Sequence, residues 1–329
     1  MNAPRFLRRV AMAGAVAVAI VGPRAAGLAI LALMLAPAVI VPLGLSLALE
    51  AKHLPRAVQR FLGAFLVLAP LGALVTTISW FMEPWFATLA ASAHAVTCFA
   101  AGILGLARLF ARREARFAPL HEFAIDVGLL LLPVAGVWFF ASRVGVSLAG
   151  FHEPVVTFTA AHFHYAGFAA PIVIGGAGRV LFADDDKGPR RLYRVAALVV
   201  CAGVPLTAIG ILTNHTIEAA GAVFLALGML CACVVLVVYV SRRAYPISRA
   251  AAVLYVVSGL VLLLTMSLAM TFALTSSAGR GANLHAGPIA IQTMIDFHGA
   301  VNAFGFALSG LVANAMIASQ RETSSKTPS

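Results

Sequence analysis

The sequence predicts an all-α fold, a polytopic bundle of transmembrane helices, and three observations support this prediction. Of the 329 residues, 61% are hydrophobic and only 11% are charged, whereas soluble proteins carry about 25% charged residues. The mean hydropathy is +0.97. The apolar residues also form long runs of about 20 residues, the length that crosses the hydrocarbon core as a helix. We therefore expect one transmembrane helical domain over residues 10–318.

Ten apolar runs, each bounded by charged residues or by Pro and Gly, define the predicted spans. The first run is short, because its helix would cover about 18 Å of a core that is roughly 30 Å thick. It is therefore either the first of about ten spans or the apolar part of a cleavable signal peptide, which would leave nine spans. In chain order the runs are 10–21, 26–49, 58–80, 86–108, 122–142, 155–182, 192–212, 217–240, 249–275 and 289–318.

Basic residues fall mainly in alternate loops, and this pattern predicts the topology. Among the 23 Lys and Arg residues, only Arg24, Arg143 and Arg280 lie in the intervening loops. Since positively charged loops stay in the cytoplasm, we expect a cytoplasmic N-terminus at residues 1–9 and a disordered, Ser- and Thr-rich cytoplasmic tail at residues 319–329. The net charge of +11 then marks cytoplasmic loops, and the sequence predicts no nucleic-acid partner.

Four histidines lie inside predicted spans and share one depth. They are about 10–14 Å from the predicted outer ends of three spans. An ionisable group at this depth is costly unless it faces the bundle interior and has a partner. We therefore expect an outer-half layer of imidazoles that binds a ligand or a metal ion, with a purely structural polar layer as the alternative. The four residues are His94, His162, His164 and His298.

Polar residues near these histidines are candidates to orient the imidazoles or to relay protons. Within one α-helix, His162 and His164 would project about 200° apart, so one ion cannot bind both without distortion. The other candidates are close to the histidines in sequence or lie in an outer loop that could cap the layer. They are Asp296, Asn302, Tyr165, His215 and Glu218.

The cysteines and the catalytic motifs carry less information. Cys98, Cys201, Cys231 and Cys233 all lie inside predicted spans, where isolated thiols act as small apolar residues. No disulfide framework is expected there. The sequence contains no carboxylate pair typical of acid–base catalysis and no nucleotide-binding motif, so it favours a role other than catalysis.

Two segments resemble the signature segments of the YndJ-like bacterial membrane proteins. One is FTAAHFHYAGF, from Phe158 to Phe168, and the other is HGAVNAFGF, from His298 to Phe306. The resemblance implies a multi-pass protein of the bacterial cytoplasmic membrane. Larger members of the family continue into an extra C-terminal region, so we expect this chain to represent only the membrane part.

A second, more local resemblance concerns cofactors. The segment Ala161–Tyr165 is similar to the helix of haem–copper oxidase main subunits that supplies axial ligands to two haems, although the His-x-x-x-Tyr copper helix of those proteins is absent from this sequence. The resemblance implies haem b as a candidate cofactor, and a set of imidazoles can also hold a Cu or Zn ion. Two functions stay open: a transporter-like site for a small solute, and a metal or haem protein with a redox partner at the outer face.

Overall fold

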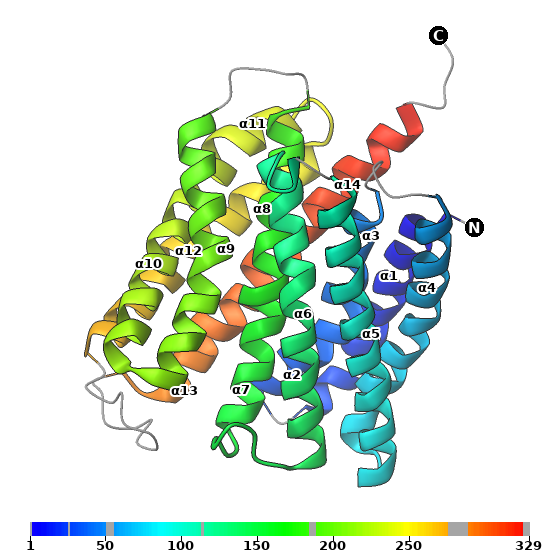
Figure 1. Ribbon diagram of the computed structural model, residues 1–329, viewed down its shortest axis with the longest axis vertical. Helices are drawn as coiled ribbons and strands as arrows, with labels where there is room; N and C mark the ends of the chain where they lie inside the picture. The colour runs from blue at the N-terminus through cyan, green and yellow to red at the C-terminus, as the bar shows by residue number, and fades with distance from the viewer. Residues whose placement is uncertain are drawn as a thin grey trace. The chain divides into compact units, whose positions relative to one another are not determined.

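The structure, a computed structural model, describes residues 2–25, 27–50, 56–112, 115–183, 189–275 and 289–324. Apart from turns and one isolated bridge between Leu148 and Phe151, these residues form helices, as Figure 1 shows. The all-α fold predicted from the sequence is confirmed.

The helices divide between two compact units, Met1–Ile172 and Val173–Ser329. In the first unit they are α1 (Ala3–Val21), η1 (Gly22–Arg24), α2 (Leu28–Leu35), η2 (Ala36–Ile40), α3 (Val41–Ala48), α4 (Arg56–Ile78), η3 (Ser79–Phe81), α5 (Pro84–Ala111), α6 (Leu120–Val144), α7 (Val155–His162) and η5 (Phe163–Ala169). Helix α8 (Ala170–Leu181) begins in the first unit and ends in the second. The second unit continues with α9 (Arg190–Thr213), α10 (His215–Val234), η6 (Val235–Val240), α11 (Ser241–Ala244), α12 (Arg249–Thr275), α13 (Ile291–Thr293), η7 (Met294–Ala300), η8 (Asn302–Leu308) and α14 (Ser309–Ser324).

Eight helical segments of the described chain are long and apolar enough to cross a membrane. The remaining two predicted spans, 58–80 and 155–182, also coincide with helices: α4 covers one, and α7, η5 and α8 together cover the other. A polytopic membrane bundle is therefore confirmed. The eight segments are Ala3–Arg24, Leu28–Ala48, Pro84–Ala111, Leu120–Val144, Arg190–Thr213, Thr216–Ala244, Arg249–Thr275 and Ile291–Ser324.

The first helix is longer than the apolar run that predicts it. The Asn2 side chain caps α1 by accepting a hydrogen bond from the Arg5 amide at 3.2 Å, and the helix runs for 19 residues, or about 28 Å. Its basic N-terminal turns are accommodated because Arg8 pairs with Glu50. A Cβ atom on Gly14 would lie 2.2 Å from the Ala38 carbonyl oxygen, so only glycine allows this close packing of α1 against η2.

The ends of the chain add two observations. Helix α14 continues to Ser324, past Ser319, where we expect the cytoplasmic tail to begin. Residues 325–329 of that tail and Arg280, one of the three basic residues assigned to outer loops, lie outside the described residues.

Several helices are interrupted by π-helical turns, in η2, η5, η6, η7 and η8. Both segments that resemble the family signatures contain such turns, the first in η5 and the second in η7 and η8. A π-helical turn inside an α-helix frequently accompanies a functional site. The histidines that these turns carry are therefore candidates for a functional site.

Helices α5 and α6 pack closely along their length, because small residues on each helix receive side chains of the other. A Cβ on Gly102 would lie 2.6 Å from Cγ of Pro133, and a Cβ on Gly136 would lie 2.7 Å from Cβ of Cys98. Small residues at helix contacts are the usual way for membrane helices to approach each other. This contact holds Cys98 against α6.

A buried cluster of charges joins the same two helices near one end. Arg108 donates to Asp126 at 2.6 Å, to Glu122 at 2.7 Å and to the Ala48 carbonyl oxygen at 2.6 Å. Arg112 also pairs with Asp126. Only 2% of Arg108 and 0% of Asp126 is exposed. Both arginines border a basic loop of the sequence, and the carboxylates on α6 compensate the charge of the buried Arg108.

Candidate metal centre

Helix α5 carries two potential metal ligands on one face. His94 and Cys98 are four residues apart, which places them one above the other on an α-helix. The Cys98 Sγ atom lies 3.5 Å from Nε2 of His94. Both side chains are enclosed by the first unit, with exposed fractions of 1% for His94 and 0% for Cys98.

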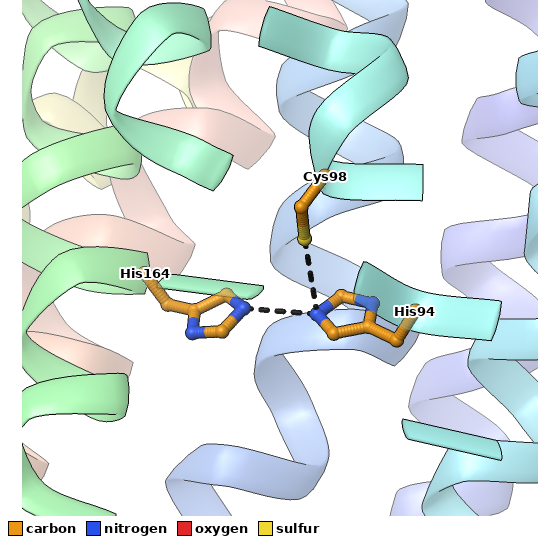
Figure 2. A group of neighbouring side chains, drawn as sticks. All are labelled: His94, Cys98 and His164. Atoms are coloured by element: carbon orange, nitrogen blue, oxygen red, sulfur yellow. Dashed lines mark hydrogen bonds between the residues drawn. The ribbon is translucent and has the colours of Figure 1, made fainter. Parts of the chain in front are cut away.

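The third potential ligand, His164, comes from η5. Its Nδ1–H donates to the Ala160 carbonyl oxygen at 2.8 Å, which leaves the Nε2 lone pair free to accept a proton or to bind a metal. That Nε2 atom lies 2.9 Å from Nε2 of His94. Figure 2 shows the two imidazoles facing each other edge to edge, with the Cys98 thiol and the His164 ring nitrogen both directed at Nε2 of His94.

The spacing of the three donor atoms fits a small metal ion after a modest expansion. His94, Cys98 and His164 each offer one ligand atom, and these atoms all lie within 4.8 Å of one another. With metal–nitrogen bonds of about 2.0 Å and metal–sulfur bonds of about 2.3 Å, ligand atoms around one ion are roughly 3.3–3.8 Å apart. The thiol–imidazole distance of 3.5 Å falls within this range, and the imidazole–imidazole distance would widen by about 0.5 Å.

Apolar and aromatic side chains surround this group. The Phe139 ring contacts both imidazoles in edge-on geometry, with centroid distances of 5.2 Å to His94 and 6.0 Å to His164. Phe139 also forms a buried cluster with Leu33, Ala91 and Ala160, against which Trp80 packs. The ligands therefore lie in a medium of low polarity, where an ion is held by its ligands and receives little help from water.

The structure places the other predicted histidines elsewhere. His162 is exposed, and its ring contacts Phe163. His298 belongs to the second unit, where its Nδ1–H donates to the Thr265 carbonyl oxygen at 2.9 Å. Asn302 lies beside it, with Nδ2 of the amide 3.5 Å from Nδ1 of the imidazole. The group of three ligands thus contains two of the four predicted histidines.

The predicted orienting residues have other partners. Asp296 accepts two hydrogen bonds of 3.0 Å from the Gln292 side chain. The Tyr165 hydroxyl donates to the Ala32 carbonyl oxygen at 2.7 Å, which fixes η5 against α2. Glu218 lies in the first turn of α10. The His215 side chain is not among those that the structure describes.

Sequence reasoning missed Cys98, because an isolated thiol inside a span has the properties of a small apolar residue. A signal was present, since His94-x-x-x-Cys98 has the spacing that places two ligands on one helical face. It would have singled out Cys98 among the four cysteines, because none of the other three follows a histidine at this distance.

Comparison with known proteins gives the family. The chain is 28% identical over 199 residues to a protein of Bacillus subtilis (strain 168) named "Uncharacterized membrane protein YndJ". The aligned region covers 60% of this chain and 34% of that relative, so the chain spans about a third of the relative's length. No solved structure matches. The family model of the YndJ-like proteins matches residues 31–306, and the chain is therefore a member of the YndJ-like family of membrane proteins.

Proposed function

We propose that this protein binds one transition-metal ion inside the membrane, through His94, Cys98 and His164. The observation that supports the proposal is the convergence of three buried donor atoms from α5 and η5 on one point. Imidazole and thiolate are the ligands that Zn and Cu ions prefer. The three side chains contact one another, through the His94–His164 bond of 2.9 Å and the Cys98–His94 contact of 3.5 Å, and one metal ion would replace both contacts with bonds to all three atoms.

The hydrogen bond from His164 to the backbone supports the same role. In most metal sites, the ring nitrogen that does not bind the metal donates to a carbonyl or carboxylate oxygen, which fixes both the tautomer and the ring orientation. The Ala160 carbonyl oxygen does this for His164 at 2.8 Å. It directs the Nε2 lone pair of His164 towards the place that an ion would take.

The geometry favours a small ion over haem b. Two imidazoles on opposite sides of a haem iron would have their nitrogen atoms about 4 Å apart, with the macrocycle between them. Here the two nitrogen atoms are 2.9 Å apart, and Phe139, which contacts both rings, belongs to a buried apolar cluster with Leu33 and Ala160. A haem would therefore have to displace part of this apolar cluster.

The same geometry limits the transporter-like role. A small polar solute has no room between nitrogen atoms that are 2.9 Å apart. A metal ion fits once the two imidazoles separate by about 0.5 Å, so transport through this site would have the ion itself as its cargo. Release of bound metal from the protein in liposomes, on the timescale of seconds, would favour transport; retention over hours would favour a resident ion.

The proposal is tested by metal analysis and an absorption spectrum of the detergent-purified protein after incubation with Zn(II), Co(II) or Cu(I) and removal of free metal. With at least one of the three metals we expect about one ion per chain, and less than a tenth of that in the His94→Ala, Cys98→Ser and His164→Ala variants. His162→Ala and Cys201→Ser are matched controls, because these residues lie outside the group of three ligands, and they should bind as the wild type does. Absence of stoichiometric metal, or equal binding by all variants, would overturn the proposal, and a haem band would replace it with the haem alternative.

A further inference from the structure

The metal centre has properties that select one class of ion, and this inference rests on the proposed function. We infer that the site selects Cu(I), a soft monovalent cation, over Zn(II) and other divalent ions. Three features of the described residues lead to this assignment: the number of ligands, the charge of the completed site, and the charges that surround it.

The number of ligands is three. Within the described chain, the group of potential ligand atoms around His94 contains only Cys98 and His164 besides His94 itself. Structural Zn(II) sites almost always have four protein ligands, and Zn(II) sites with three protein ligands add a water or a substrate, which the apolar side chains around this group disfavour. Soft thiolate ligands suit Cu(I), and a set of two imidazoles and one thiolate can surround a monovalent ion without a fourth residue.

The charge of the completed site favours a monovalent ion. A coordinating cysteine binds as a thiolate, and both imidazoles bind in their neutral form. Cu(I) with this ligand set therefore has a net charge of zero, whereas Zn(II) leaves a net charge of +1. An uncompensated charge is strongly disfavoured in an apolar interior, so the divalent ion carries a penalty that the monovalent ion does not.

The surrounding charges do not compensate a divalent ion. The carboxylates of Glu122 and Asp126 on α6 are already paired with arginines, and Asp126 is about 20 Å along the helix from Phe139. The charged side chain that is connected to the Phe139 cluster through packed aromatic rings is an arginine, so it adds positive charge. Arg143 stacks 3.9 Å above Trp80, and Trp80 contacts Phe139 with a centroid distance of 6.2 Å.

Binding needs no oxidant or reductant. A Cu(I) ion forms bonds to Nε2 of His94, Nε2 of His164 and Sγ of Cys98. The Cys98 thiol releases its proton. Without metal, the His94 proton lies between the two imidazoles, because His164 donates from Nδ1; on metal binding it moves to Nδ1 of His94. One proton is released for each Cu(I) bound, and copper stays monovalent.

The test compares ions on the same preparation of the full chain, under anaerobic conditions. Cu(I) is supplied from a chromogenic chelator, and Zn(II) and Co(II) are supplied at a tenfold excess over protein. We expect about one Cu(I) per chain, with two nitrogen neighbours and one sulfur neighbour by X-ray absorption, and less than 0.1 Zn(II) or Co(II). One Zn(II) per chain that is lost in Cys98→Ser would overturn the selectivity but leave the proposed function standing. Absence of both ions would overturn both.

A second variant tests the charge argument directly. Phe139→Glu places a carboxylate beside both imidazoles, so it should raise the Zn(II) occupancy at least tenfold over the wild type. Phe139→Leu removes the ring without adding charge, and its Zn(II) occupancy should stay at the wild-type level. Cu(I) binding by each sample shows that it is folded, and equal Zn(II) occupancy in the two folded variants would contradict the role of charge. If Phe139→Glu does not fold, the comparison of ions on the wild type decides.

Discussion

Gly136 on α6 should position Cys98, and its replacement by alanine gives a quantitative test. The new Cβ atom would lie 2.7 Å from Cβ of Cys98 and 3.1 Å from its Sγ, whereas carbon atoms in contact are about 3.5–4.0 Å apart. The two helices, or the Cys98 side chain, must therefore move by about 1 Å. Metal–ligand distances tolerate only about 0.2 Å, so Gly136→Ala should take the thiolate out of bonding range.

The expected result is a tenfold to hundredfold loss of Cu(I) affinity, the range typical of residues that orient metal ligands. Overpacking should also lower the free energy of unfolding by about 1–3 kcal/mol. Competition with a chromogenic Cu(I) chelator measures the first quantity, and unfolding in detergent measures the second. Gly63→Ala is the matched control, since the described atom nearest to its new Cβ would be Cβ of Ala3, at an ordinary 3.5 Å. Wild-type affinity in Gly136→Ala, with unfolding unchanged, would show that this helix contact does not position Cys98.

Three further predictions concern the rest of the fold. Arg108→Met should lower the free energy of unfolding by about 3–5 kcal/mol, because removal of one partner leaves buried carboxylates uncompensated; an effect below 1 kcal/mol in detergent unfolding would contradict this. Gly176→Ala should destabilise the second unit by about 1–3 kcal/mol, since its Cβ would lie 2.3 Å from the Asn314 side chain. Unfolding of the full chain in detergent measures this loss. If α1 is a retained span, the intact mass of the purified protein will include residues 3–21, and a mass that lacks them would identify a cleaved signal peptide.

The fold was largely predictable from the sequence, because a membrane span depends on the local average of hydropathy. The run 86–108 predicts most of α5, and 122–142 predicts most of α6. The ends of helices were less predictable, since they depend on partners distant in sequence. Helix α1 begins at Ala3, after the Asn2 cap, and its basic first turns include Arg8, which pairs with Glu50; this pairing leaves no trace in a hydropathy profile.

The candidate site was predictable only in part. His94 and His164 stand out because few ionisable residues occur inside the spans. Their pairing could not be derived, because the π-helical turn of η5 changes the helical period on which face assignments rest. The same limit applies to Asp296, which lies two residues from His298 in η7 and yet accepts its hydrogen bonds from Gln292. Whether the remaining candidates take part in binding stays a prediction.

Helix α5 and its C-cap residue Arg112 carry two pairs of residues with the same four-residue spacing, and both pairs face α6. One pair is His94 and Cys98, and the other is Arg108 and Arg112, which is about 15 Å further along the helix. A rotation of α5 about its own axis would break both at once. The buried charges therefore fix the rotation of α5 about its axis, and this rotation sets the direction of the His94 and Cys98 side chains. Substitutions in the charge cluster should therefore lower the affinity of the proposed site for metal, although none of these residues is a ligand, because the two ends of α5 are coupled through its rotation.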